Sequence, residues 1–228
     1  MKTMNIATNI ESIDDHFAAA NNAVISESPE VLTEIYQEPV NIAVWQNSQS
    51  QVIETSAQTL ITESPNFKLV LTVTPESALE SLLDSSVYLE DHKALCEHVA
   101  LLVDVFCTLF ELKRVGLRLT ALSHAMCPKF HVDKVPCRLV TTFVGDTTQW
   151  LPSNVVDRTK LGAGSLGLPD HESGVYQKES DIQQLSVGDV ALLKGEGWFN
   201  NEGNGIVHRS PALLKTKQRL LLTLDFID

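Results

Sequence analysis

The spacing of apolar residues changes near residue 116, and this change constrains the fold more than any other feature of the chain. Between residues 89 and 112, apolar side chains recur every three or four positions, the pattern of an amphipathic helix packed on a core. After Gly116, short β-prone segments are separated by Gly, Pro and Asn, as in an antiparallel sandwich or barrel. The chain is therefore predicted to be α+β, with a mainly helical N-terminal region at 1–115 and a β core at 116–228.

Local patterns predict the individual elements. Helices are expected near residues 10–23 and 51–62, and another from Pro75 onward, where proline favours a first helical turn. Residues 200–205 (NNEGNG) are interpreted as a tight hairpin turn, and the Gly-rich segment 162–180 as either a lid or a simple loop. Strands are expected at 41–45, 66–74, 117–122, 138–144, 190–193, 205–207 and 219–226.

Charge is distributed unevenly along the chain, which has a formal net charge of −12. Residues 1–66 contain nine acidic residues and one basic residue, whereas residues 112–160 contain eight basic and three acidic residues. A positive region of this kind favours an anionic substrate. It lacks the aromatic residues interleaved with basic ones that a nucleic-acid-binding surface would show, so nucleic acid is not the expected partner.

Neither a membrane span nor an export signal is expected. No apolar run reaches the ~20 residues that a transmembrane helix needs. The start of the chain, MKTMNIATNIESIDDH, has no apolar segment after its single lysine. The four cysteines are too few for a disulfide scaffold in a chain of 228 residues. We therefore expect a cytoplasmic protein with reduced thiols.

The strongest chemical signal is the string CPKFHVD at residues 127–133. On an extended strand, side chains alternate between faces, so His131 and Asp133 are expected to point the same way and Val132 the opposite way. A third ligand is available in His208, which lies in GIVHRSP, 75 residues after Asp133. Two histidines and one carboxylate with open positions form the facial triad that suits non-haem iron(II).

The order of the segments resembles a known superfamily. HVD is followed by RLVTTFVG, VGDVALLKGEGW, VHRSP and RLLLTLDF. Over residues 120–226 this order is similar to the core of the iron(II)/2-oxoglutarate-dependent dioxygenases, a double-stranded β-helix or jelly roll. The resemblance implies that His131, Asp133 and His208 hold Fe(II), and that the protein is a 2-oxoglutarate-dependent oxygenase, an oxidoreductase acting on an unknown substrate.

In that superfamily, an Arg or Lys on the strand after the distal histidine binds the far carboxylate of 2-oxoglutarate. Arg219 lies eleven positions beyond His208 and has the fork of donors that suits a carboxylate, with Lys215 and Lys217 as alternatives. Arg138, on the β-prone segment after HVD, is a second candidate for cofactor binding. It would reach a second carboxylate or pair with an aspartate on the surface.

The strings CPKFHVD and VHRSP also look like those of an uncharacterised bacterial family of unknown function, so the resemblance does not specify a substrate. The nucleic-acid demethylase branch of the superfamily would have a second arginine near the end of the last strand. This chain has Asp225 there.

A second, non-catalytic hypothesis arises from the cysteines. Cys127 and Cys137 flank the HVD motif, four residues away on each side. A thiolate added to the two histidines and the aspartate would favour closed, tetrahedral zinc, with a role in structure, sensing or intracellular metal handling. Both cysteines adjoin prolines, and the sequence leaves open whether either is a ligand.

Overall fold

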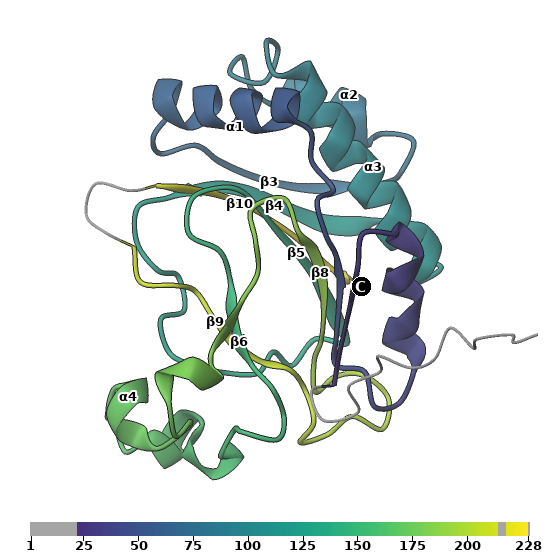
Figure 1. Ribbon diagram of the computed structural model, residues 1–228. Coiled ribbons are helices and arrows are strands. Elements are labelled where there is room, and N and C mark those ends of the chain that lie inside the picture. The colour runs from purple at the N-terminus through teal and green to yellow at the C-terminus, as the bar shows by residue number, and fades with distance from the viewer. Residues whose placement is uncertain (1–21, 214–217, 228) are drawn as a thin grey trace, which may run out of the picture.

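The computed structural model describes residues 22–213 and 218–227, and within them the chain forms two β-sheets and a layer of helices (Figure 1). The helix expected near 10–23 lies outside this part of the chain except for its last two positions. The larger sheet has the strand order β1 (Ala23–Ser26), β2 (Ile42–Trp45), β8 (Val190–Lys194), β5 (Cys137–Val144), β10 (Arg219–Asp225), β4 (Val115–Leu122) and β3 (Lys68–Val73). The smaller sheet has the order β7 (Gln183–Gln184), β6 (Gln149–Leu151) and β9 (Val207–Arg209).

Neighbouring strands of the larger sheet come from distant parts of the sequence. Strand β8 lies between β2 and β5, and β10 lies between β5 and β4; all of these pairs are antiparallel. The two sheets pack against each other through an apolar cluster in which Trp150 of β6 joins Ile42, Ala191 and Leu193 of the larger sheet. This arrangement confirms the predicted α+β class with a jelly-roll core.

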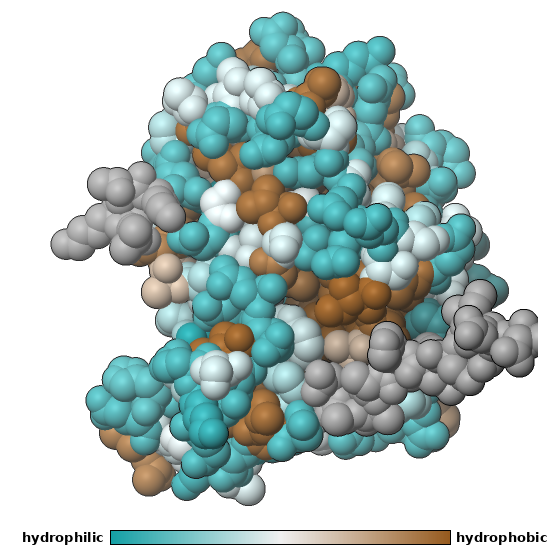
Figure 2. Space-filling model, viewed as in Figure 1, coloured by the Kyte–Doolittle hydropathy of each residue, from teal (hydrophilic) through white to brown (hydrophobic). Residues whose placement is uncertain are grey.

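Three helices, α1 (Gln51–Glu63), α2 (Ala78–Ser85) and α3 (Lys93–Leu109), lie together on one face of the larger sheet (Figure 1). Their apolar faces bury against leucines of the sheet, because residues three and four positions apart share one side of a helix. The outer surface of this layer is mostly hydrophilic (Figure 2). No helix in the described part of the chain is both long enough and apolar enough to cross a membrane.

The remaining helical segments are short. The 3₁₀ helix η1 (Pro29–Tyr36) connects β1 to β2. The segment between β6 and β7 contains α4 (Asp170–Ser173) and the short 3₁₀ helices η2 (Arg158–Lys160), η3 (Gly162–Ser165) and η4 (Glu179–Asp181). The Gly-rich sequence 162–180 therefore contributes several single turns rather than one open loop.

Alternation along the strands gives the larger sheet two different faces. On β10, Leu220, Leu222 and Leu224 belong to the core beneath the helices. Arg219, Leu221 and Thr223, at the alternate positions, line a cavity on the opposite face. We call this opposite face, which looks towards the smaller sheet, the inner face.

Strands from before residue 115 complete the larger sheet at both of its edges. Strand β2 pairs with β8, β1 pairs with β2, and β3 pairs with β4. The core beneath the helices likewise contains residues from both parts of the chain. The division into 1–115 and 116–228 stays a prediction, but strand pairing and the core both cross it.

Candidate metal centre and its cavity

His131 and His208 are brought together by backbone pairing. The amide of each donates to the carbonyl of the other, with N···O distances of 3.0 Å in both directions. Asp133 follows two residues after His131 and turns to the same side, so one potential ligand atom from each of the three residues lies within 4.8 Å of the others. Among the described residues, this is the one group of three or more His, Cys, Asp or Glu side chains that close.

Both imidazole rings are oriented by their Nδ1 atoms. Nδ1 of His131 lies 2.9 Å from the carbonyl oxygen of Lys129, and Nδ1 of His208 lies 3.1 Å from that of Ile206. A carbonyl only accepts, so each Nδ1 carries the proton and each Nε2 presents a lone pair. These Nε2 atoms face Asp133 at 3.7 Å and 3.5 Å, respectively. This is the tautomer that a metal-binding histidine needs when its other nitrogen donates to a carbonyl.

Their surroundings keep His131 and Asp133 in metal-binding protonation states. Burial, followed by the close approach of the His208 imidazole, lowers the pKa of His131 and so favours neutral imidazole. Burial tends to raise the pKa of Asp133. Its close contact with His208 and the positive charge of Arg138 outweigh it and lower that pKa to about 2. Asp133 is therefore ionised at neutral pH.

Arg138 holds the carboxylate of Asp133. Its Nη1 donates to Oδ2 of Asp133 at 2.6 Å, and its Nε donates to Oδ1 of Asp225 at 2.7 Å. Arg138 on β5 and Asp225 on β10 are direct cross-strand partners, so the pairing of these two strands places both residues beside Asp133. These contacts favour a supporting role for Arg138 over the cofactor-binding role predicted from the sequence.

Arg219, at the start of β10, is 1% exposed and lines the cavity next to the triad. Its Nη2 donates to Oγ1 of Thr142 at 3.3 Å, but its buried Nε and Nη1 have no hydrogen-bond partner among the described residues. Burial lowers its pKa to about 10, against the attraction of Asp146. Unsatisfied donors of a buried guanidinium are costly, and an anion in the cavity would satisfy them. Lys215 and Lys217 lie outside the described residues.

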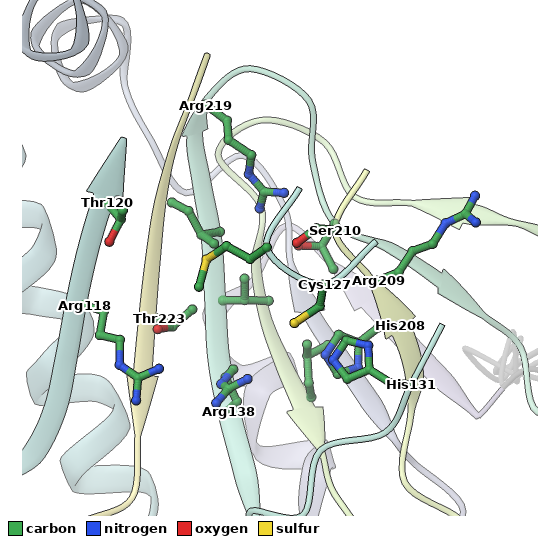
Figure 3. A pocket seen from close by; sticks show the side chains of 15 residues that line it. Arg118, Thr120, Cys127, His131, Arg138, His208, Arg209, Ser210, Arg219 and Thr223 are labelled. Atoms are coloured by element: carbon green, nitrogen blue, oxygen red, sulfur yellow. The ribbon is translucent and has the colours of Figure 1, made fainter. Parts of the chain in front are cut away.

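The cavity has a volume of about 90 Å³ and lies against the inner face of the larger sheet. His131 and His208 line it, and Val140, Leu193 and Leu221 form an apolar part of its wall. Figure 3 shows Arg219 towards one end and Arg118 and Arg138 towards the other. These positions agree with the strands, since Arg118 pairs with Thr223 at the opposite end of β10 from Arg219.

The Gly-rich segment supports the triad indirectly. Oδ2 of Asp170, in α4, accepts hydrogen bonds from the amide of Phe130 at 3.0 Å and from Nη1 of Arg209 at 2.8 Å. Phe130 precedes His131, and Arg209 follows His208, so one carboxylate ties together the two chain segments that carry the imidazoles. Asp170 gave no signal in the sequence, because its partners are about 40 residues away in each direction.

The two cysteines near the motif have different environments. Cys137 is fully buried in the core beneath the helices, and burial raises the pKa of its thiol, which disfavours the thiolate that zinc requires. Cys127 is exposed and lines the cavity with the histidines (Figure 3). Its sulfur is not part of the ligand cluster formed by the triad.

Comparison with known proteins gives one family match. The model of the family described as "Protein of unknown function (DUF1826)" matches residues 26–225. No curated protein matches the chain.

Several solved structures are similar in fold. The dioxygenase for auxin oxidation from rice is 10% identical, with a TM-score of 0.49, and the match covers 90% of this chain and 82% of that one. HygX from Streptomyces hygroscopicus, solved with nickel and 2-oxoglutarate bound, is 11% identical, with a TM-score of 0.46 and coverage of 87% and 86%. A prolyl-4-hydroxylase from Pseudomonas putida is 11% identical, with a TM-score of 0.42 and coverage of 86% and 96%.

Proposed function

This chain belongs to the DUF1826 family, proteins of unknown function, and we propose that it is an iron(II)- and 2-oxoglutarate-dependent oxygenase. One observation carries the proposal. Both histidines of the His131–Asp133–His208 cluster line the same cavity as Arg219, a buried guanidinium with two donors that have no partner among the described residues. A site for a metal and a site for an anion thus lie next to each other in one cavity.

The donor set fits iron(II). Nε2 of His131, Nε2 of His208 and a carboxylate oxygen of Asp133 would be the three protein ligands, and two histidines with one carboxylate is the set typical of non-haem Fe(II) oxygenases. Three protein ligands leave coordination positions open for small molecules. When bound there, iron would supply the activation of O₂ that the protein's own side chains cannot perform.

Arg219 fits the far carboxylate of 2-oxoglutarate. Its guanidinium offers parallel donors that match a carboxylate in a bidentate manner, and Thr142 holds one edge of the group in place. Because the site is buried, the attraction between the two charges is stronger than it would be in water. Binding would also satisfy the unpartnered Nε and Nη1 atoms of Arg219.

The other side chains of the cavity orient the site and exclude water. Arg138 donates to Oδ2 of Asp133 and so fixes the carboxylate beside the Nε2 atoms of both histidines. Val140, Leu193 and Leu221 form an apolar wall beside the ligands. A wall of this kind keeps bulk water away from a reactive centre.

In the zinc hypothesis, in which the same triad holds zinc with or without a thiolate, Cys127 is the remaining candidate for a fourth ligand. A buried, protonated Cys137 on the helical side of the sheet is unsuited to ligation. All four cysteines are free, in keeping with the cytoplasmic location that we propose. Metal analysis of protein purified without added metal separates the two hypotheses. Zinc that is lost on Cys127→Ser substitution would favour the structural role, whereas iron retained at one equivalent in Cys127→Ser protein favours the oxygenase.

The proposed activity is tested by turnover of the co-substrate. Protein loaded anaerobically with Fe(II) and then given 2-oxoglutarate and O₂ is expected to form succinate slowly without any added substrate. His131→Ala and Arg219→Gln should remove this activity, because they delete a metal ligand and the carboxylate site, respectively. Succinate formation at the same rate in His131→Ala protein would place the activity elsewhere and contradict the proposal.

A further inference from the structure

The inner face of the larger sheet is covered over one half and open over the other. Over β2, β8 and β5, its residues Val44, Leu193 and Val140 are at most 4% exposed, because the smaller sheet packs on them. Over β3 and β4, the corresponding residues Val70 and Arg118 are 57% and 52% exposed. An open stretch of sheet therefore continues outward from the cavity.

Strand pairing defines the members of this open stretch. Lys68 pairs with Thr120, Val70 pairs with Arg118, and Arg118 pairs with Thr223 on its other side. Cross-strand partners project from the same face, and alternation adds Thr72 of β3. We call this surface the open shelf; it consists of Lys68, Val70, Thr72, Arg118, Thr120 and Thr223.

The open shelf is polar and positively charged. Lys68 is exposed, and the guanidinium of Arg118 donates no hydrogen bond within the described residues. The nearest carboxylate oxygen to Arg118 is Oδ2 of Asp225, at 3.9 Å, which is an ion pair without a hydrogen bond; the bond of 2.7 Å from Arg138 goes to the other oxygen, Oδ1. Arg118 therefore retains donors for an anion that approaches from solvent.

The open shelf is directly connected to the candidate metal centre. Arg118, Thr120 and Thr223 line the same cavity as His131 and His208. Arg118 is also linked to Asp133 through a chain of charged contacts that runs over Asp225 and Arg138. A molecule anchored at Arg118 would thus extend towards the triad from the end of the cavity opposite Arg219.

We propose that the open shelf binds the substrate to be oxidised, and that this substrate is a small organic molecule with a carboxylate or phosphate group held by Arg118. The inference rests on the oxygenase function proposed above. It assigns different anions to the two ends of the cavity: the co-substrate binds at the buried Arg219 and the substrate at the exposed Arg118. The three threonines of the shelf add neutral donors and acceptors beside the anionic group.

The test uses the metal-loaded protein with its co-substrate site filled. Protein loaded with Ni(II), which does not support turnover, is first titrated with 2-oxoglutarate to saturation. It is then titrated calorimetrically with benzoate, with phenyl phosphate and with neutral benzamide. Benzoate or phenyl phosphate is expected to bind and benzamide to fail, and the tighter of the two anions identifies which group the shelf prefers.

Variants locate the binding. Arg118→Gln should weaken binding of the anion by at least about tenfold, the scale of a lost hydrogen bond to a charged group. Lys113→Gln removes the same charge from an exposed residue that does not line the cavity, and should leave binding unchanged. Equal anion affinity in Arg118→Gln and wild-type protein would overturn the inference. So would a matching loss of 2-oxoglutarate affinity in Arg118→Gln, which would assign Arg118 to the co-substrate.

Failure of the inference and failure of the proposed function give different results. Wild-type protein that takes up 2-oxoglutarate but neither anion contradicts the open shelf as a substrate site. Wild-type protein that takes up no 2-oxoglutarate contradicts the proposed function itself. Tight binding of a single-stranded oligonucleotide that is lost in Arg118→Gln would replace the small molecule with nucleic acid and overturn the stated substrate class.

Discussion

At the scale of single residues, hydrogen bonds restrain the side chains of all three candidate metal ligands. Each imidazole is fixed by a hydrogen bond from Nδ1 to a carbonyl two residues before it, and Asp133 is fixed by Arg138. Such contacts pre-organise ligands, because the side chains lose little further freedom when an ion binds.

Removal of any one ligand is expected to affect the metal affinity in the same way. His131→Ala, Asp133→Ala and His208→Ala should each weaken binding of Fe(II) by at least about 100-fold, because two remaining ligands cannot hold the geometry. Val132→Ala is the matched control. Val132 packs on the opposite side with the cluster around Phe130, so its loss should reduce stability and spare the metal. Full metal occupancy in His208→Ala, measured by calorimetry, would show that the distal ligand is misassigned.

The support of Asp133 can be tested separately from ligation. Arg138→Met removes the donor to Asp133 and should weaken metal binding by about 10–100-fold, the usual effect of losing a partner of a ligand. Arg138→Lys keeps the positive charge but lacks the planar set of donors of a guanidinium, and it should recover part of the metal affinity. The ligand-field spectrum of the Co(II)-loaded protein should also change in Arg138→Met, since Asp133 would be free to rotate. An unchanged spectrum and affinity would reduce Arg138 to a packing role.

The sequence pointed to the three candidate ligands but not to the residues that hold Asp133 in place. Expected alternation in HVD and the position of VHRSP grouped His131, Asp133 and His208. The structure brings them together through an isolated bridge between His131 and His208, and HVD itself is not part of a strand. The partners of Arg138 depend on the register between β5 and β10, and Asp225 lies 87 residues away in sequence. No local pattern encodes that pairing. Arg118 was counted only as part of a basic region, since its place on the open shelf depends on the same sheet order.

At the scale of elements, most strands were predicted close to their observed bounds, and the connections were not. The segment 200–205 was interpreted as a tight hairpin turn, but β8 before it belongs to the larger sheet and β9 after it to the smaller one. The segment is therefore a crossover between sheets, and the hairpin interpretation was wrong. Glycine and asparagine favour any reversal of the chain, and they do not specify which strands flank it.

Gly145 allows the close contact between β5 and β10 that positions Arg219. Gly145, at the end of β5, has φ of +90°, and a Cβ there would lie 2.3 Å from the carbonyl oxygen of Gln218 and 2.8 Å from Cα of Arg219. Only glycine lets the end of β5 approach the start of β10 this closely.

Gly145→Ala is therefore expected to displace Arg219. The strain of a positive φ alone costs about 1–2 kcal/mol, and the backbone overlap adds to it. Gly167→Ala is the matched control, because Gly167 has φ of +81° with nothing within 4 Å of the added carbon. Gly145→Ala should lower both the free energy of unfolding and the affinity for 2-oxoglutarate, and Gly167→Ala only the former. Equal 2-oxoglutarate affinity in the two variants would contradict this account of Gly145.

At the scale of the whole molecule, the larger sheet is assembled from both parts of the chain. The sequence predicted strands at 41–45 and 66–74 but could not assign them to the β core. Their pairing with β8 and β4 is set by contacts across more than 40 residues. The change of apolar period near residue 116 marks where helices give way to strands, and the hydrophobic core extends across it.

Residues 116–228 expressed alone are accordingly expected not to fold. Leu119, Leu220, Leu222 and Leu224 pack beneath the helices, and each would return to water at a cost of about 1.5–3 kcal/mol. Circular dichroism and thermal unfolding of this fragment, compared with the full chain, provide the measurement. A fragment that unfolds cooperatively would support the predicted division near residue 115 as a boundary between independent units.

The central claim, a metal site and a 2-oxoglutarate site in one cavity, is tested most directly by calorimetric titration of 2-oxoglutarate into anaerobic, Fe(II)-loaded protein. The wild-type protein is expected to bind one equivalent, and Arg219→Gln is expected to bind at least about 100-fold more weakly, because it loses a buried, bidentate charge pair. Protein from which Fe(II) has been removed should also bind 2-oxoglutarate more weakly. Absence of 2-oxoglutarate binding in wild-type protein that does bind Fe(II) would contradict the claim.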